Sequence, residues 1–184
     1  MALTKTPICN FGEKAKDFNL KSTENKQMSL KDVSGANGTL IMFICNHCPY
    51  VKAIIKDLVS DIKYLEGLGI NSVGIMSNDV KNYPDDSFEN MISFSKLNEF
   101  SFPYLIDETQ NVAKEYGAVC TPDFFGYNKN LELQYRGRIR ELKDLKPVRK
   151  GDSDLKIAMK LVAETGKGPK DQIPSMGCNI KWFK

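Results

Sequence analysis

The sequence lacks several features that would assign it to a common class. It has one histidine in 184 residues, and it contains no internal repeat or low-complexity tract. No apolar run reaches the roughly 18 residues of a membrane-spanning helix, so we expect no membrane partner. Residues 1–18 also lack the apolar stretch of a secretory signal, which predicts a cytoplasmic location.

The sequence also lacks an even set of cysteines. It has five, and an odd number does not fit the disulfide framework of a small secreted protein. We therefore expect thiols that are reduced or only transiently oxidised. The net charge of +3 and the 41% hydrophobic content are ordinary for a globular chain that can bury a core. Residues 136–150 are strongly basic but contain no aromatic side chain, which favours a solvated face over a nucleic-acid partner.

Hydrophobic periodicity predicts strands that alternate with helices. We expect a hairpin over residues 17–30, buried strands over 39–44, 71–77 and 103–107, helices over 49–65, 87–98, 109–116 and 153–164, and a second hairpin over 124–135. This order predicts one domain over residues 1–184, with a largely parallel sheet and helices on both faces. The tail, residues 166–184, is expected to be irregular.

Two cysteines stand where the first buried strand meets the first long helix, in 41-IMFICNHCPYVKAI-54. We expect Asn46 to cap this helix and Pro49 to lie in its first turn. Cys45 and Cys48 are close enough to form a small disulfide ring, and the N–H groups and dipole of a helix start stabilise a thiolate. We expect Cys45 to be the more exposed thiol and to attack, and Cys48 to resolve the mixed disulfide. A cationic His47 would stabilise the reduced pair, although a solvated loop histidine is the alternative.

A second motif precedes a predicted core strand, in 119-VCTPD-123. The bond between Thr121 and Pro122 is a candidate cis peptide, with an ordinary trans bond as the alternative. If it is cis, the backbone of Thr121 would face whatever lies opposite. Cys120 is either a buried small hydrophobe or a third redox thiol near the motif. Cys178, in the tail, is either a resolving thiol or a packing residue.

The C-N-H-C-P and Thr-Pro motifs resemble those of the thioredoxin superfamily, and most closely its redoxin branch, which contains the thiol-specific antioxidant proteins. Residues 12–33, the stretch GAVCTPDFF and the tail PSMGCNIKW are similar to those of bacterial thioredoxin-like members. The resemblance implies a thioredoxin-like α/β fold, with a central mixed β-sheet, helices on both faces and an N-terminal β-hairpin extension. It also implies an insertion after the second core strand and a cis peptide at Pro122.

The resemblance leaves two chemistries open. Peroxidases of the branch carry Thr-x-x-Cys and use an arginine near the cysteine. Here Cys45 occupies the threonine position and Cys48 the peroxidatic one, with Arg136 and Arg138 as candidate arginines.

The function that we predict is thiol–disulfide exchange through a redox pair of Cys45 and Cys48, without a cofactor or metal. The backbone at Thr121 would receive the substrate chain. The expected partners are a protein disulfide substrate and a thiol reductant or oxidant, and the chain is expected to be a monomer or weak dimer. Two alternatives stay open: a thiol-dependent peroxidase, and a non-enzymatic metal-binding or interaction module. In the second, Cys45, His47 and Cys48 would bind zinc together with a distant Cys120 or Cys178.

Overall fold

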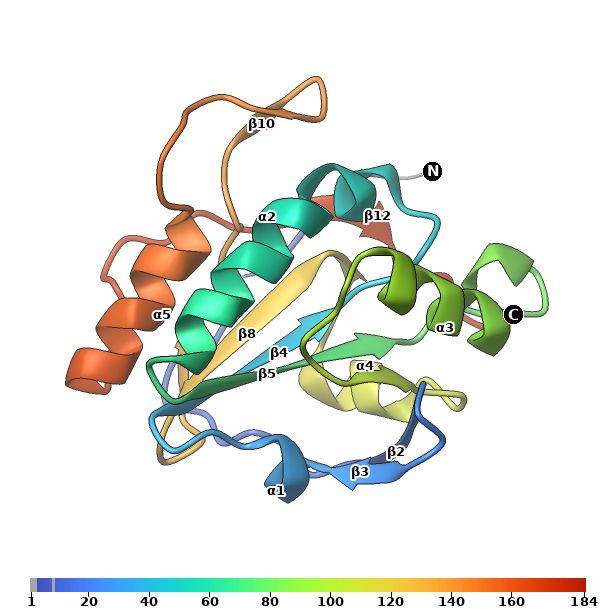
Figure 1. Ribbon diagram of the computed structural model, residues 1–184, viewed down its shortest axis with the longest axis horizontal. Coiled ribbons are helices and arrows are strands. Elements are labelled where there is room, and N and C mark those ends of the chain that lie inside the picture. Colours follow the sequence, from blue (N-terminus) through green and yellow to red (C-terminus); the bar gives the residue numbers. More distant parts are fainter. Residues whose placement is uncertain (1–2, 8) are drawn as a thin grey trace.

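The computed structural model of the protein describes residues 3–7 and 9–184. Within these residues the centre is a mixed sheet of seven strands, in the order β3-β2-β6-β5-β4-β8-β9 (Figure 1). Its strands are β2 (Asn19–Ser22), β3 (Gln27–Ser29), β4 (Gly38–Phe43), β5 (Ile70–Met76), β6 (Tyr104–Ile106), β8 (Asp123–Asn128) and β9 (Leu133–Tyr135). The central strands β4, β5 and β6 are parallel, and the flanking strands are antiparallel. The expected mixed sheet and N-terminal hairpin are confirmed. The expectation from the element order of a largely parallel sheet is wrong, because β2, β3, β8 and β9 all pair antiparallel.

Helices cover both faces of this sheet. One face carries α2 (Pro49–Glu66), α3 (Phe88–Leu97) and α5 (Asp154–Thr165), and the other carries α1 (Leu30–Val33) and α4 (Asn111–Tyr116). Strand β4 is buried along its whole length because its side chains alternate between these two layers. Leu40 and Met42 pack toward α2, while Ile41 and Phe43 pack toward α4. This burial explains the uninterrupted apolar run in the sequence.

The tail differs from the expectation. Residues Met176–Asn179 form a strand, β12, which pairs on one side with β1 (Leu3–Lys5) and on the other with β7 (Cys120–Thr121). The prediction that 166–184 is irregular throughout is therefore wrong. A four-residue strand has no measurable periodicity, and both of its partners lie far away in the sequence. This small sheet brings the tail onto the start of α2.

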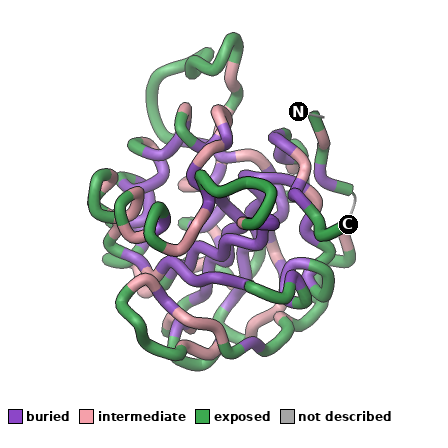
Figure 2. The backbone as a smooth tube through the Cα atoms, turned by 90° about the vertical axis from the view of Figure 1, so that its right-hand side faces the viewer, coloured by how far each residue is buried: buried purple, intermediate pink, exposed green. Residues whose placement is uncertain are grey.

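Two short elements complete the chain. A single turn of 3-10 helix, η1 (Pro84–Asp86), lies in the insertion between β5 and α3. The strands β10 (Leu142–Lys143) and β11 (Lys146–Pro147) form an arm that projects from the body (Figures 1 and 2). Most of the basic stretch lies on this exposed arm, as expected of a solvated face. Across residues 3–7 and 9–184, no helix is long and apolar enough to cross a membrane.

Candidate active site

The two motif cysteines lie at the junction of β4 and α2, as the sequence predicted. Cys48 caps the N-terminus of α2, and Pro49 is the first helical residue. Our expectation that Asn46 is the cap is wrong, because its side chain instead donates to the carbonyl of Asp85 and accepts from the hydroxyl of Tyr104. The cap position places the Cys48 sulfur, and not that of Cys45, nearest to the positive end of the helix.

Neither motif thiol is open to solvent. Cys45 is 1% exposed and Cys48 is 0% exposed. The expected difference in exposure between the two is therefore wrong. Because no water is available to stabilise a charge on either sulfur, the hydrogen bonds of each thiol determine its pKa.

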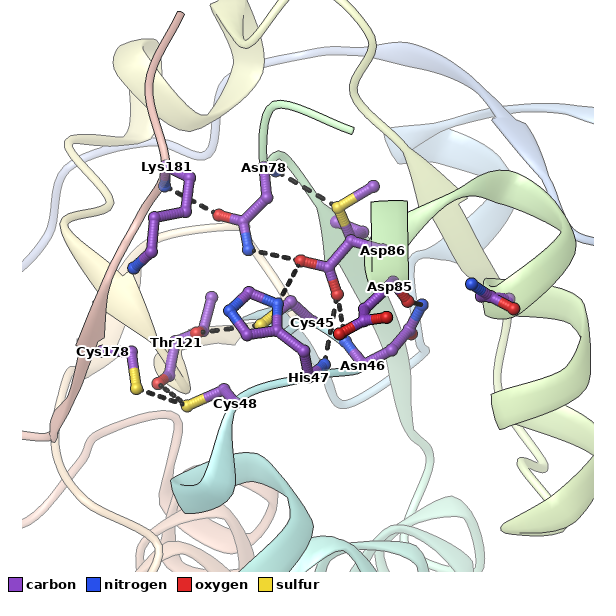
Figure 3. Close-up of polar contacts among 12 residues, drawn as sticks. Cys45, Asn46, His47, Cys48, Asn78, Asp85, Asp86, Thr121, Cys178 and Lys181 are labelled. Carbon is purple, nitrogen blue, oxygen red and sulfur yellow. Dashed lines mark hydrogen bonds and ion pairs between the residues drawn. The ribbon is translucent and has the colours of Figure 1, made fainter. Parts of the chain in front are cut away.

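Cys48 Sγ lies at the centre of a cluster of sulfur and oxygen atoms (Figure 3). It is 3.1 Å from Cys178 Sγ and 3.2 Å from the carbonyl oxygen of Thr121. Cys45 Sγ lies 3.3 Å from the hydroxyl of the same threonine. As a thiol, Cys48 donates to the carbonyl or to Cys178. As a thiolate, it accepts from the thiols of Cys45 and Cys178.

These donors make Cys48 the acidic thiol of the pair. The hydrogen bond from Cys45, aided by Cys178 and by the N–H of Val51, lowers the pKa of Cys48 to about 5 from the ordinary 9.0. Cys45 shifts the opposite way: its hydrogen bond to Cys48, its burial and the carboxylate of Asp86 raise its pKa well above 9.0. One sulfur thus carries the charge and the other carries the proton.

His47 is bound to a buried carboxylate from the insertion. Its Nδ1 lies 2.6 Å from Asp86 Oδ2, and the backbone N–H groups of Asn46 and His47 donate to the other carboxylate oxygen at 2.8 and 3.2 Å. The hydrogen bond to Asp86 raises the pKa of His47 despite its partial burial. Burial opposes the charge of Asp86, but hydrogen bonds from His47 and Asn78 hold its pKa below the usual range. The ion pair orients the motif loop.

The same carboxylate ties the C-terminal tail to the motif. Asn78 donates to Asp86 at 2.8 Å and accepts from the backbone N–H of Lys181 at 2.8 Å (Figure 3). The backbone carbonyl of Lys181 in turn accepts from Asp79 and Gln110. The tail is therefore held over the motif by hydrogen bonds on both sides of Lys181.

The peptide bond between Thr121 and Pro122 is cis, as the resemblance implied. However, the backbone of Thr121 is not open to a substrate chain. Strand β12 pairs antiparallel with β7, and Cys178 lies directly opposite Thr121. The Ser175 hydroxyl also donates to the Pro122 carbonyl at 2.7 Å. The chain's own tail thus occupies the edge that we expected a substrate to use.

Other candidates lie apart from this cluster. Cys120 is fully buried, its thiol donates to the Pro122 carbonyl, and its burial raises its pKa, so it is an unreactive thiol in this structure.

The two candidate arginines are both held in ion pairs. Arg136 forms a buried ion pair with Asp123, at 3.1 Å. Arg138 pairs with Asp154 at 2.8 Å. Both candidate arginines are therefore engaged by carboxylates instead of by a motif thiol.

Three residues in the described part of the chain could supply metal ligands from one place. Ligand atoms of Cys45, His47 and Asp86 all lie within 4.8 Å of one another. This set differs from the one that we considered from the sequence, which used Cys48 and a distant cysteine. Cysteine, histidine and carboxylate ligands suit zinc, which would compete with the ion pair between His47 and Asp86.

Sequence reasoning missed Asp86 and Asn78 and left Cys178 undecided. Asp86 is 39 residues from His47, and Cys178 is 130 residues from Cys48. The only signal for Asp86 was its place in the insertion that the resemblance implied. No local pattern marks its side chain as one that turns inward.

Comparison with known proteins places this site in a family. The model of the AhpC/TSA family matches residues 11–142, which include the motif, the insertion and the cis-proline. The chain belongs to the AhpC/TSA family. This membership assigns the protein to thiol-based redox chemistry in general, but it does not separate disulfide exchange from peroxide reduction. No curated protein matches the chain.

Solved structures agree with the AhpC/TSA fold. An uncharacterized conserved protein from Geobacillus kaustophilus is 37% identical, with a TM-score of 0.94 over 100% of this chain and 97% of its own. A hypothetical protein from Sinorhizobium meliloti is 34% identical, with a TM-score of 0.90 over 98% of each chain. The thioredoxin domain of a thiol-disulfide oxidoreductase from Bacteroides vulgatus is 13% identical, with a TM-score of 0.60 over 70% of this chain and 89% of its own. This last likeness supports the fold alone.

Proposed function

We propose that the protein is a thiol–disulfide oxidoreductase that works through a reversible disulfide between Cys45 and Cys48. The observation that carries the proposal is the placement of both thiols beside Thr121 at the start of α2: Cys48 Sγ lies 3.2 Å from its carbonyl oxygen and Cys45 Sγ lies 3.3 Å from its hydroxyl. The pKa of Cys48 is lowered and that of Cys45 is raised, which makes Cys48 the thiolate of the pair. A thiolate is the nucleophile in disulfide exchange, and a neighbouring thiol can resolve the product. The odd number of cysteines favours the cytoplasm as the site of this exchange.

The proposed roles reverse those that we expected from the sequence. Cys48 attacks one sulfur of the substrate disulfide and releases the other as a thiolate. Its negative charge then disappears, so the main cause of the raised pKa of Cys45 is removed. Cys45 loses its proton to the departing thiolate, attacks Cys48 Sγ and releases the second substrate thiol. The substrate gains two electrons, and the pair becomes a disulfide.

The backbone pairing of Thr121 limits the substrates of this reaction. A protein chain that approached the cis-proline would have to displace β12, whereas a small disulfide would need less room. We therefore propose small-molecule disulfides, or flexible protein segments, as substrates. A thiol reductant or oxidant would return the pair to its starting state.

The test is a redox titration in glutathione buffers, with alkylation and mass spectrometry of the peptides. We expect a reversible disulfide between Cys45 and Cys48 that is lost in both Cys45→Ser and Cys48→Ser. Cys9→Ser is the matched control, because Cys9 is half-buried and packs at the opposite face of the sheet. If the pair never forms in wild-type protein, the proposal is wrong. Stoichiometric zinc that protects Cys45 from alkylation would instead support the metal-binding alternative.

Peroxide reduction is the second candidate, and one observation favours it. By the resemblance of its motif to Thr-x-x-Cys, Cys48 stands at the peroxidatic position, and it is the acidic thiol of the site. The missing threonine and the engagement of Arg136 and Arg138 by carboxylates count against it. Saturable hydrogen peroxide consumption that survives in Cys45→Ser but not in Cys48→Ser would favour the peroxidase.

A further inference from the structure

Cys178 reaches Cys48 from the C-terminal tail, whereas the pair's other thiol, Cys45, lies on the motif loop. It lies on β12, is 3% exposed, and is held directly opposite Thr121 by antiparallel pairing. Its sulfur is 3.1 Å from Cys48 Sγ (Figure 3). A disulfide bond is about 2.05 Å long, so the two sulfurs need to approach by only about 1 Å to bond.

The pairing of β12 fixes this approach. Adding a side chain to Gly177, the neighbour of Cys178, would force its Cβ against the carbonyl of Thr121. Ser175 and Lys181 anchor the strand on either side, through the Pro122 carbonyl and Asn78. Cys178 is therefore held on a paired strand at the position beside the cis-proline where a substrate cysteine would be presented.

The proton on Cys178 depends on the charge of Cys48. Burial, together with the hydrogen bond to Cys48, raises the pKa of Cys178 to about 12. In the reduced state Cys178 is thus a donor that stabilises the Cys48 thiolate. Once Cys48 is bonded to another sulfur, it no longer carries the charge that retains this proton.

We propose that Cys178 is a third redox thiol, which forms a disulfide with Cys48 in competition with Cys45. The inference rests on the proposed function, because it takes Cys48 as the exchanging sulfur. Cys48 first attacks a substrate disulfide, forms a mixed disulfide and releases one thiolate, which accepts the proton of Cys178. Cys178 then attacks Cys48 Sγ and releases the second substrate thiolate, which is protonated by solvent. The substrate is reduced by two electrons, and Cys48 and Cys178 become a disulfide.

A further exchange connects the two disulfides. Cys45 can attack Cys48 Sγ in this second disulfide, so that the bond between Cys48 and Cys178 breaks and the bond between Cys45 and Cys48 forms. The proton of Cys45 passes to the departing Cys178 thiolate, which becomes a thiol again. Cys48 would then alternate between two partners, one on the motif loop and one on the tail. Oxidation to the tail would also lock β12 over the motif.

The experiment uses full-length Cys45→Ser, in which only Cys178 remains beside Cys48. The protein is oxidised with glutathione disulfide, quenched by alkylation and cleaved after lysine. Cys48 and Cys178 then fall in separate peptides, residues 32–52 and 171–181, so a cross-link between them is diagnostic. We expect this cross-linked pair to be the main product. We also expect the mixed disulfide of Cys48 with glutathione to decay at least about tenfold faster than in Cys45→Ser/Cys178→Ser.

Controls separate the two proposals. Cys45→Ser/Cys120→Ser should behave like Cys45→Ser, because Cys120 bonds to a carbonyl and not to Cys48. Wild-type protein, oxidised briefly with diamide, should show the cross-link without any substitution. If wild-type forms the motif disulfide while neither it nor Cys45→Ser forms the cross-link, only the role of Cys178 is overturned. If neither disulfide ever forms, the proposed function fails as well.

Discussion

The pKa of about 5 at Cys48 is measurable by the ultraviolet absorbance of the thiolate near 240 nm. At pH 7 a thiol with this pKa is about 99% ionised, whereas an ordinary thiol near pKa 9 is about 1% ionised. Cys45, Cys120 and Cys178 all have raised pKa values. Titration of the reduced protein from pH 3 to pH 8 should therefore show close to one thiolate, with a midpoint near 5.

The substitution Cys48→Ser should remove this transition, and Cys9→Ser should leave it unchanged. Absorbance reports an equilibrium, so the burial of Cys48 does not affect the result as it would affect a reaction rate. A wild-type midpoint above 8, or a low midpoint that persists in Cys48→Ser but disappears in Cys45→Ser, would refute the assignment of the charge to Cys48.

The same ionisation predicts how stability depends on pH. The pKa of Cys48 is lower in the folded protein than in the unfolded chain, so ionisation of this thiol stabilises the folded state. This contribution to the free energy of unfolding is fully present above pH 9, the unfolded pKa, and is lost as the pH falls through 5, the folded pKa. Between pH 5 and pH 8 it changes the free energy of unfolding by on the order of 3 kcal/mol. Urea unfolding gives the free energy of unfolding of the reduced wild-type and Cys48→Ser proteins at each pH. The difference between the two pH profiles isolates the contribution of Cys48, because the other titrating groups are common to both proteins. Parallel pH profiles would contradict it.

Three further predictions concern His47, the packing of α2 and the cap of α5. Asp86→Asn should lower the pKa of His47, because the carboxylate that raises it is lost; NMR follows the single imidazole directly, and an unchanged pKa would show that Asp86 does not set the charge. Ile62→Ala, at a site that is 0% exposed, should cost about 2–5 kcal/mol of unfolding free energy, whereas Ile157→Ala, at a site 50% exposed, should cost less than about 0.5; equal costs in thermal or urea unfolding would count against the packing described. Ser153→Ala should cost about 1–2 kcal/mol of unfolding free energy, because the buried Ser153 hydroxyl caps α5; unchanged stability in urea unfolding would contradict this capping role.

Local sequence patterns were enough to predict the central strand β4 and the helix α2. The run from Leu40 to Phe43 is apolar at every position because β4 is buried on both faces. The residues of α2 repeat at helical spacing because one side of the helix packs on the sheet. Both patterns arise within a single element, so they can be read without knowledge of its neighbours. The same locality placed Cys45 and Cys48 at the junction of these two elements.

Local sequence patterns could not predict which of the two thiols, Cys45 or Cys48, is the nucleophile. Their order along the chain favoured Cys45 as the nucleophile, but the hydrogen bonds around Cys48 favour that residue. Those bonds come partly from Cys178, which only the pairing of β12 with β7 brings to the site. The cap position also moved from Asn46 to Cys48, because Asn46 is occupied by contacts with Tyr104 and Asp85.

The sequence by itself determined the alternation of strands and helices, the position of the redox motif and, through resemblance, the family and the cis-proline. Tertiary structure decided which sulfur carries the charge, which carboxylate holds His47 and what covers Thr121. The physical reason is the distance along the chain: 39 residues separate His47 from Asp86, and 130 separate Cys48 from Cys178. Such contacts leave no periodic trace in either segment, because they depend on how separate elements pack together and not on the fold of one of them.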